Sequence, residues 1–260
     1  DIDGVYSNPA GLAFLPEDGL YLSLNGLSAY QTRNIKATFP LFIEDGNTRY
    51  YKGKASAPFI PSFQGAYKKG DWTISGSFAV VGGGGKASFD DGLGMFDSMV
   101  MGQVHTISGG QITPNMYSIN SAMDGSQFIY GVQLGLSYQV NDWLGVFAGG
   151  RMNYFTGGYE GFLTATAHSN IPTYGGMELV GIYLDCDQTC CGLTPILGAD
   201  VKLGKWNIGL KYEFMTSLNL ENKTKKAEVR AMGTAMGDEG NPLADYKDGV
   251  NTPSDIPALL

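Results

Sequence analysis

The chain has two histidines, and each is followed closely by a serine: Ser108 comes three residues after His105, and Ser169 follows His168 directly. A histidine that activates a serine hydroxyl is the centre of many hydrolases, where a carboxylate orients the imidazole ring. Neither histidine has an acidic residue at a readable spacing, and neighbours in sequence do not make a triad, which the fold assembles. We therefore predict no catalytic residue and no enzyme activity.

Three cysteines, Cys186, Cys190 and Cys191, are the other reactive side chains. Their spacing matches neither a zinc-ligand set nor a redox Cys-x-x-Cys pair, so we expect no metal and no cofactor. An exported loop allows a disulfide from Cys186 to one of the other two. Three unpaired loop thiols are the alternative, and the spacing leaves both interpretations open.

Five charged residues stand on the polar faces of otherwise apolar segments: Arg151, Asp200, Lys202, Lys211 and Glu213. Charges on an enclosed face are costly unless they are paired. We therefore predict that these five side chains form one ion-pair network that braces the protein from inside.

The elements that carry these charges alternate with a period of two. Between Phe128 and Val140, aromatic and aliphatic residues occupy every second position, opposed by glycine, serine and glutamine with Ile129 as the exception. Such alternation predicts a strand with two different faces. Its 13 residues exceed the roughly 9 to 11 that cross a bilayer as a tilted strand. The chain is therefore predicted to be all-β, with strands that face lipid on one side.

Each of the three tryptophans, Trp72, Trp143 and Trp206, opens a strand directly after a short polar turn. Aromatic residues at one end of two-sided strands are typical of the membrane interface of an outer-membrane β-barrel. Only 16% of the 260 residues are charged, against about 25% in soluble domains. The net charge of -8 argues against nucleic-acid binding.

Connection lengths alternate as they do in such barrels, with short turns at 68–71, 141–142 and 204–205. Seven strands are expected near 19–31, 58–67, 72–81, 127–140, 143–156, 191–203 and 206–220, with an eighth starting near 256. The long connections are predicted to be extracellular loops at 31–57, 82–126, 157–190 and 221–255. Residues 44–47 suggest a hairpin turn, so the first two strands should extend above the membrane.

Residues 7–15, Ser-Asn-Pro-Ala-Gly-Leu-Ala-Phe-Leu, directly precede the first strand. Together with the order of strands and loops, they resemble the Asn-Pro-Ala signature of the FadL family of outer-membrane transport proteins for long-chain fatty acids and aromatic hydrocarbons. The resemblance implies that Asn8, Pro9 and Ala10 belong to a hatch that plugs the barrel. Residues 1–18 would then be the end of this hatch. Residues 19–260 would be the first half of a fourteen-stranded barrel, in a fragment of a longer exported protein.

The resemblance also implies an inward kink in the third strand that opens the barrel wall to the membrane. Here that strand runs into Gly82, Gly83, Gly84 and Gly85, which favour either a bulge or a flexible loop hinge. Family members release their ligand sideways at the kink, so these glycines are the predicted lateral opening.

The loop that follows contains a methionine-rich stretch predicted to form a short helix. Its apolar residues are Met95, Phe96, Met99 and Val100. Such spacing is typical of packing, but methionine surfaces also suit greasy ligands of variable shape. We predict a hydrophobic ligand groove at these four positions.

The function expected from these features is passive uptake of fatty acids, lipids or similar hydrophobic small molecules by a monomeric protein embedded in the lipid of the bacterial outer membrane. Arg151 or Lys211 would be available to meet a fatty-acid carboxylate. A general outer-membrane porin or a structural barrel without hydrophobic-ligand specificity is the alternative, and a soluble β-sandwich binding module is a third interpretation.

Overall fold

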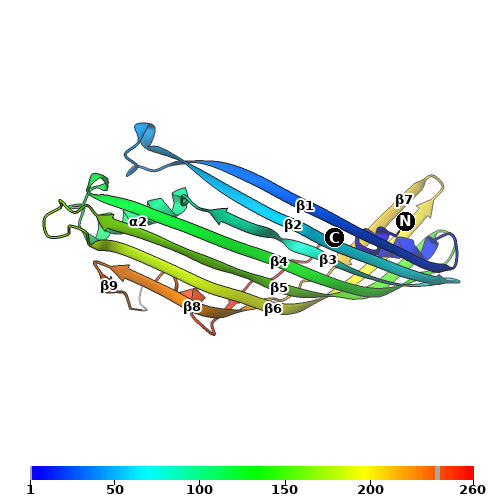
Figure 1. Ribbon diagram of the computed structural model, residues 1–260. Coiled ribbons are helices and arrows are strands. Elements are labelled where there is room, and N and C mark those ends of the chain that lie inside the picture. The colour runs from blue at the N-terminus through cyan, green and yellow to red at the C-terminus, as the bar shows by residue number, and fades with distance from the viewer. Residues whose placement is uncertain (1, 238–240) are drawn as a thin grey trace.

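The computed structural model describes residues 2–237 and 241–260. The strands in these ranges form one antiparallel sheet (Figure 1). Neighbouring strands follow one another along the chain in the order β1-β2-β3-β4-β5-β6-β8-β10, while β7 pairs with β6 and β9 with β8. The strands are β1 (Gly19–Thr38), β2 (Thr48–Lys69), β3 (Trp72–Phe89), β4 (Tyr117–Gln139), β5 (Leu144–Ala167), β6 (Glu178–Leu203), β7 (Trp206–Glu213), β8 (Asn219–Ala231), β9 (Thr234–Ala235) and β10 (Asn251–Pro253).

The strands are much longer than the alternation suggested. β6 has 26 residues and spans about 86 Å at roughly 3.3 Å per residue, well over the roughly 30 Å of a bilayer's hydrocarbon core. The prediction of long loops at 31–57, 82–126, 157–190 and 221–255 is therefore wrong for most of the first and third ranges and for parts of the other two, where the residues continue the strands. Residue 1 of the expected hatch and residues 238–240 of the last expected loop lie outside the described residues.

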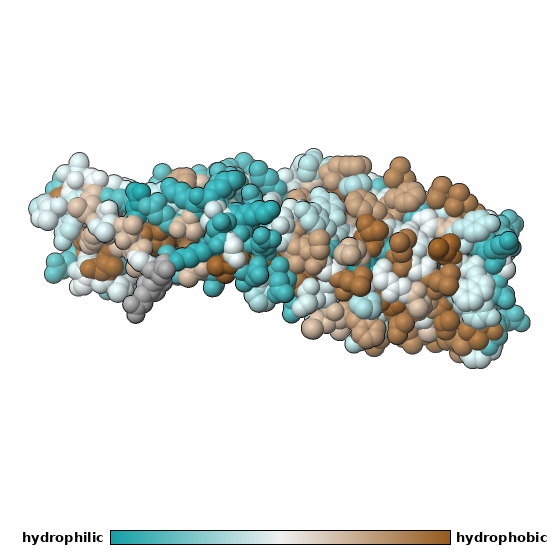
Figure 2. All heavy atoms as spheres, turned by 90° about the horizontal axis from the view of Figure 1, so that it is seen from below, coloured by the Kyte–Doolittle hydropathy of each residue, from teal (hydrophilic) through white to brown (hydrophobic). Residues whose placement is uncertain are grey.

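The outer surface divides these strands into two halves. Near the short turns large apolar side chains point outward, for example Leu24, Leu134 and Leu193, which are 80%, 63% and 60% exposed. Figure 2 shows hydrophobic residues gathered over this half and hydrophilic residues over the other. Trp72 and Tyr138 pack together at the turn end, with ring centroids 4.5 Å apart. We call the apolar part the membrane half and the rest the outer half.

The inner surface has the opposite polarity, and β5 shows the change within one strand. Residues of odd number face inward along its length, because Arg151 and Asn153 are buried in the membrane half, and Leu163 and Ala165 are buried in the outer half. Apart from the buried Phe147 and Phe155, the inner face is thus polar where the outer face is apolar, and it is apolar where the outer face is polar. Solvent outside and a hydrophobic core inside explain the outer half as an ordinary folded domain.

The polar inner face holds the N-terminal segment, residues 2–18, which contains α1 (Gly4–Ser7) and the 3-10 helix η1 (Pro9–Phe14). These two turns contact strands from β2 to β7. A flat sheet of six strands would be about 24 Å across, too wide for one short segment to touch. The sheet therefore curves around the N-terminal segment, as expected for part of a barrel wall.

At the other end of the sheet lies α2 (Gly94–Ile107), which packs inside the outer half (Figure 1). Its residues Val100, Met101 and Val104 join a core that includes Leu163 and Val180. Three further 3-10 turns, η2 (Asp45–Asn47), η3 (Pro114–Met116) and η4 (Ala244–Tyr246), lie in connections, and η2 makes the hairpin expected at 44–47. None of the helices in the described ranges combines the length and hydrophobicity needed to cross a bilayer.

One predicted strand is interrupted. The segment expected at 206–220 forms β7 against the lower part of β6 and β8 against its upper part. The break lies opposite Pro195, which has no N–H to donate to a neighbouring strand. Side chains bridge the break, since the hydroxyl groups of Thr194 and Thr216 are hydrogen-bonded.

Candidate functional site

Side chains of the wall bind the backbone carbonyls of the N-terminal segment. Five carbonyl oxygens of this segment accept a hydrogen bond from a strand residue. The donors are Gln133 to Val5 (2.7 Å), Lys211 to Tyr6 (2.8 Å), Ser137 to Pro9 (2.7 Å), Thr73 to Leu12 (3.1 Å) and Lys68 to Ala13 (2.7 Å). Because these donors come from β2, β3, β4 and β7, the segment is fixed to the wall on several sides.

The Asn-Pro-Ala residues lie at the centre of this contact. The Asn8 amide donates to Asp200, Pro9 begins η1, and Ala10 is fully buried. The wall accommodates Asn8 through Gly209, where an added Cβ would lie 2.6 Å from the amide nitrogen of Asn8. The glycine on β7 is therefore required by the close approach of the N-terminal segment.

The five predicted network charges do not form one network. Arg151 and Lys211 both pair with Glu213, and the Lys211 to Glu213 distance is 2.7 Å. Asp200 instead accepts hydrogen bonds from Asn8 and from Asn207 at 3.0 Å. Lys202 lies 4.0 Å from the ring centroid of Phe14, so both residues hold the N-terminal segment rather than the ion pairs.

The same contacts argue against binding of a ligand carboxylate by Arg151 or Lys211. Arg151 is buried and makes two hydrogen bonds to Glu213, and Lys211 also binds the Tyr6 carbonyl. Both cations also lie over the Tyr6 ring, at 5.4 and 4.7 Å from its centroid. Because the protein already supplies their partners, neither is free for a ligand.

The four glycines interrupt β3 as a bulge, which confirms that interpretation over a loop hinge. Pairing with β4 shifts register between Val80 and Gly82 and again between Gly82 and Gly85. Gly83 and Gly85 have φ values of 104° and 74°, which favour glycine. At Gly83 an added Cβ would lie 2.2 Å from the Gln127 carbonyl oxygen. Whether ligand leaves the barrel at this point stays a prediction.

The bulge also separates β3 from β2. Their pairing stops at Ser62 with Ala79 and resumes at Ser56 with Lys86. We call the unpaired stretch, residues 57–61 of β2 and 80–85 of β3, the seam. The β2 side was not expected from the sequence, although Pro58 and Pro61 within a strand were a readable signal, because proline cannot donate to a ladder.

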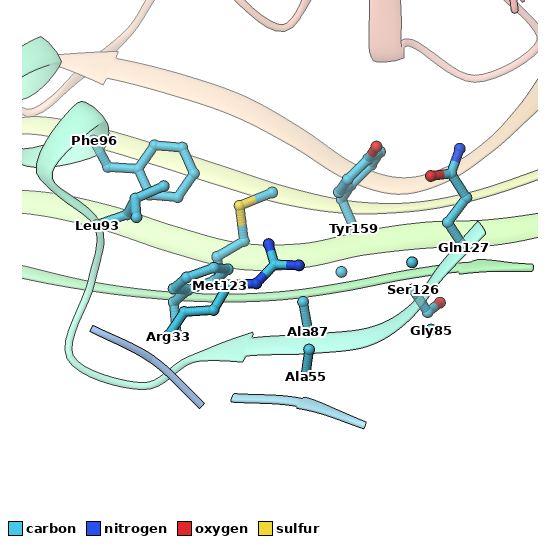
Figure 3. A pocket seen from close by; sticks show the side chains of 13 residues that line it. Arg33, Ala55, Gly85, Ala87, Leu93, Phe96, Met123, Ser126, Gln127 and Tyr159 are labelled. Carbon is cyan, nitrogen blue, oxygen red and sulfur yellow. The ribbon is translucent and has the colours of Figure 1, made fainter. Parts of the chain in front are cut away.

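A cavity of about 220 Å³ lies on the inner side of the seam, and we call it the inner cavity. Figure 3 shows Phe96 and Leu93 at one end, Arg33 beside Met123, and Tyr159 and Gln127 at the other end. Apart from Arg33, the wall is largely apolar or backbone. Its other lining residues are Ala55, Gly84, Gly85, Ala87, Phe89, Gly125 and Ser126.

Arg33 was not expected from the sequence. Its guanidinium donates to Gln31 at 3.0 Å, and the described residues provide it with no ion pair. It is thus the cation at the inner cavity with capacity to bind an anionic group.

A second cavity, of about 250 Å³, lies under α2, and we call it the outer cavity. Met95, Phe96 and Met99 line it, as predicted for the groove, whereas Val100 is fully buried in the core and was wrongly included. The outer half supplies the remaining apolar walls. They are Ala122, Met123, Gly161, Phe162, Leu163, Ile182, Leu184, Pro242, Leu243 and Tyr246.

A buried carboxylate fixes the first turns of α2. Asp97 accepts hydrogen bonds from Arg49 (3.1 Å), Tyr51 (2.9 Å) and Ser121 (3.2 Å). Burial and the bond to Asp97 raise the pKa of Tyr51, so this hydroxyl stays protonated and donates. An acidic residue within a methionine-rich stretch was the signal that sequence analysis left unused.

The reactive side chains are placed differently from expectation. Cys186, Cys190 and Cys191 are free thiols on β6 rather than loop residues. On a strand, residues four and five apart are separated by about 13 and 17 Å, so neither predicted disulfide can form. His168 contacts Ser118 at 3.0 Å instead of Ser169. No metal-binding group of three or more His, Cys, Asp or Glu side chains occurs in the described part of the chain.

Comparison with known proteins supports the fold. No protein family and no curated protein sequence matches the chain. Among solved structures, the crystal structure of the toluene transporter TodX of Pseudomonas putida aligns with a TM-score of 0.52 at 16% identity. The alignment covers 98% of this chain and 59% of TodX. The chain therefore shares the antiparallel wall of an outer-membrane β-barrel and spans 59% of that structure's length.

Proposed function

We propose that the protein is an outer-membrane transporter of hydrophobic small molecules, of the FadL type, and that this chain forms the hatch end and first half of its barrel. The observation that carries the proposal is the position of the inner cavity between the outer cavity and the seam. An apolar path thus leads from the outer half toward the wall. The similarity to a toluene transporter is consistent with it.

Ligand would enter the outer cavity, where burial of apolar surface contributes roughly 25 cal/mol per Å². Met95, Phe96 and Met99 would provide an adaptable apolar surface for it. The ligand would then occupy the inner cavity against Gly84 and Gly85 and leave sideways through the seam into the membrane. No energy source is needed for a solute that partitions favourably into lipid.

The seam has the chemistry that lateral release requires. Backbone groups of 57–61 and 80–85 make no ladder bonds to each other, so a passing solute breaks none there. Phe59 is 69% exposed within the seam, which places apolar surface at its rim. The N-terminal segment would act as the hatch that closes the membrane half below.

Two measurements on the full-length protein in its membrane test the proposal. We expect uptake of radiolabelled oleate or toluene by cells that express it, above the level of cells that do not. We expect little steady ion conductance in a planar bilayer, because the N-terminal segment would plug the polar interior as a hatch. Large open conductance without hydrophobic uptake would instead identify a general porin.

A further inference from the structure

The two cavities have two side chains in common. Phe96 and Met123 line both, one from α2 and the other from β4. All other lining residues belong to one cavity alone. The pair therefore lies on the direct way from one cavity to the other.

The helix that carries Phe96 is fixed on several sides. Asp97, the next residue, is buried and hydrogen-bonded to β2 and β4. An added Cβ at Gly94 would lie 2.3 Å from the Cβ of Ala37, so the start of α2 lies directly against β1. Val100 and Val104 are fully buried below it. A shift of the whole helix would break these contacts, whereas a side-chain rotation breaks none of them.

The two shared side chains are suited to such a rotation. Methionine has three rotatable bonds and adapts its shape to its neighbours. Rotation of a packed side chain needs free space beside it and is slower than rotation of an exposed one. Here the cavities themselves provide the space, since each is apolar and lies directly beside the pair (Figure 3).

We propose that Phe96 and Met123 form a side-chain gate between the outer and inner cavities, held at a fixed position by the Asp97 anchor, and that the gate sets the rate of ligand transfer. This inference rests on the proposed transport function. It adds a distinct transfer step after capture of the ligand. This step is governed by these two side chains rather than by movement of α2.

Stopped-flow fluorescence of cis-parinaric acid mixed with the detergent-solubilised full-length protein tests the gate. We expect a fast phase for the outer cavity and a slower phase for transfer. Phe96→Ala should raise the slow rate about tenfold or more, and Phe96→Trp should lower it severalfold. Met123→Ala should also raise it. The matched control Met99→Ala lines the outer cavity alone and should change the fast-phase affinity, with the slow rate within twofold of the native protein.

Three outcomes would overturn the gate. They are a single phase in the native protein, a slow rate unchanged in both Phe96→Ala and Met123→Ala, or a slow rate that Met99→Ala changes as much. Phe96→Leu, which keeps an apolar side chain, guards against misfolding and should give an intermediate rate. Absence of any probe binding would instead refute the proposed function itself.

Discussion

Gly84 offers the most direct test of the inner cavity. Unlike its neighbours Gly83 and Gly85, it does not have a positive φ, and an added Cβ meets no atom within 4 Å. A leucine at this position therefore fits without backbone strain and extends from the bulge that lines the inner cavity. The substitution should fill space that a ligand would otherwise occupy and leave the fold intact.

The size of the effect follows from the space removed. Leucine adds four carbon atoms at Gly84, which displace about four methylene groups of an apolar ligand. At roughly 0.8 kcal/mol for each buried methylene, the loss is about 3 kcal/mol, or about 200-fold in Kd. A ligand that shifts toward the outer cavity would recover part of this, so a tenfold loss is the smallest effect consistent with the argument.

Fluorescence titration of the full-length protein with cis-parinaric acid measures this affinity. Gly102→Leu is the matched control, because Gly102 on α2 also has open space around its Cβ and lines neither cavity. We expect native affinity for the control and weak binding for Gly84→Leu. A loss of affinity smaller than tenfold for Gly84→Leu, or an equal loss in both variants, would refute the assignment of the inner cavity.

Three further predictions concern charge. Glu213→Ala leaves Arg151 buried without its carboxylate, so we expect the free energy of unfolding to fall by about 3 to 5 kcal/mol. Urea titration followed by tryptophan fluorescence measures this, and an unchanged midpoint would contradict the pairing. Arg33→Ala should weaken binding of oleic acid about tenfold or more, since a hydrogen bond to a charged group contributes about 1.5 to 3 kcal/mol. The affinity for oleyl alcohol should not change, and an equal loss for both ligands would exclude carboxylate recognition. Burial raises the pKa of Tyr117 to about 12, so the folded state retains a proton that the unfolded chain releases near pH 10. The stability contributed by Tyr117 is therefore present below about pH 10 and lost as the pH rises toward 12, and Tyr117→Phe should reduce the fall in melting temperature between these values.

The sequence was sufficient to predict the membrane half. Trp72, Trp143 and Trp206 marked the short turns, and alternation beside them located the strands, although Phe147 and Phe155 depart from it in the strand after Trp143. Both signals arise from local contact with lipid, which selects aromatic residues at the interface and apolar residues on the outer face. The short turns between β2 and β3, β4 and β5, and β6 and β7 are accordingly where the pattern placed them.

The outer half was not predicted from the sequence, because the alternation there has the same period but places its apolar residues on the inner face. Leu163 and Ala165 alternate with Thr164 and Thr166, but the apolar residues now face inward. Glycines at 157 and 158 precede this reversal and hide the continuity of β5. A rule that apolar residues face outward predicts the end of the strand at the point where the polarity changes, although the strand continues beyond it.

The polar contacts inside could not be derived for a different reason. Asn8 and Asp200 are 192 residues apart, and their pairing depends on curvature of the whole sheet around the N-terminal segment. Charge alone suggested that Asp200 and Lys202 would pair with Arg151, Lys211 and Glu213. The N-terminal segment provides competing partners that no local pattern indicates, and these partners divide the five charges into two groups.

The distribution of hydrogen bonds favours the seam over the N-terminal segment as the route out of the inner cavity. To move the segment aside, the protein must break five bonds from wall side chains to its carbonyls, together with the contact of Asn8 with Asp200. At about 1 kcal/mol for each neutral bond, and more for those from lysine, the cost exceeds about 5 kcal/mol before any burial is lost. The seam has no ladder bonds between its two sides to break. If the protein transports apolar solutes as proposed, we therefore expect a solute at Gly84 and Gly85 to meet a lower barrier sideways than downward, with lipid rather than the periplasm as its first destination.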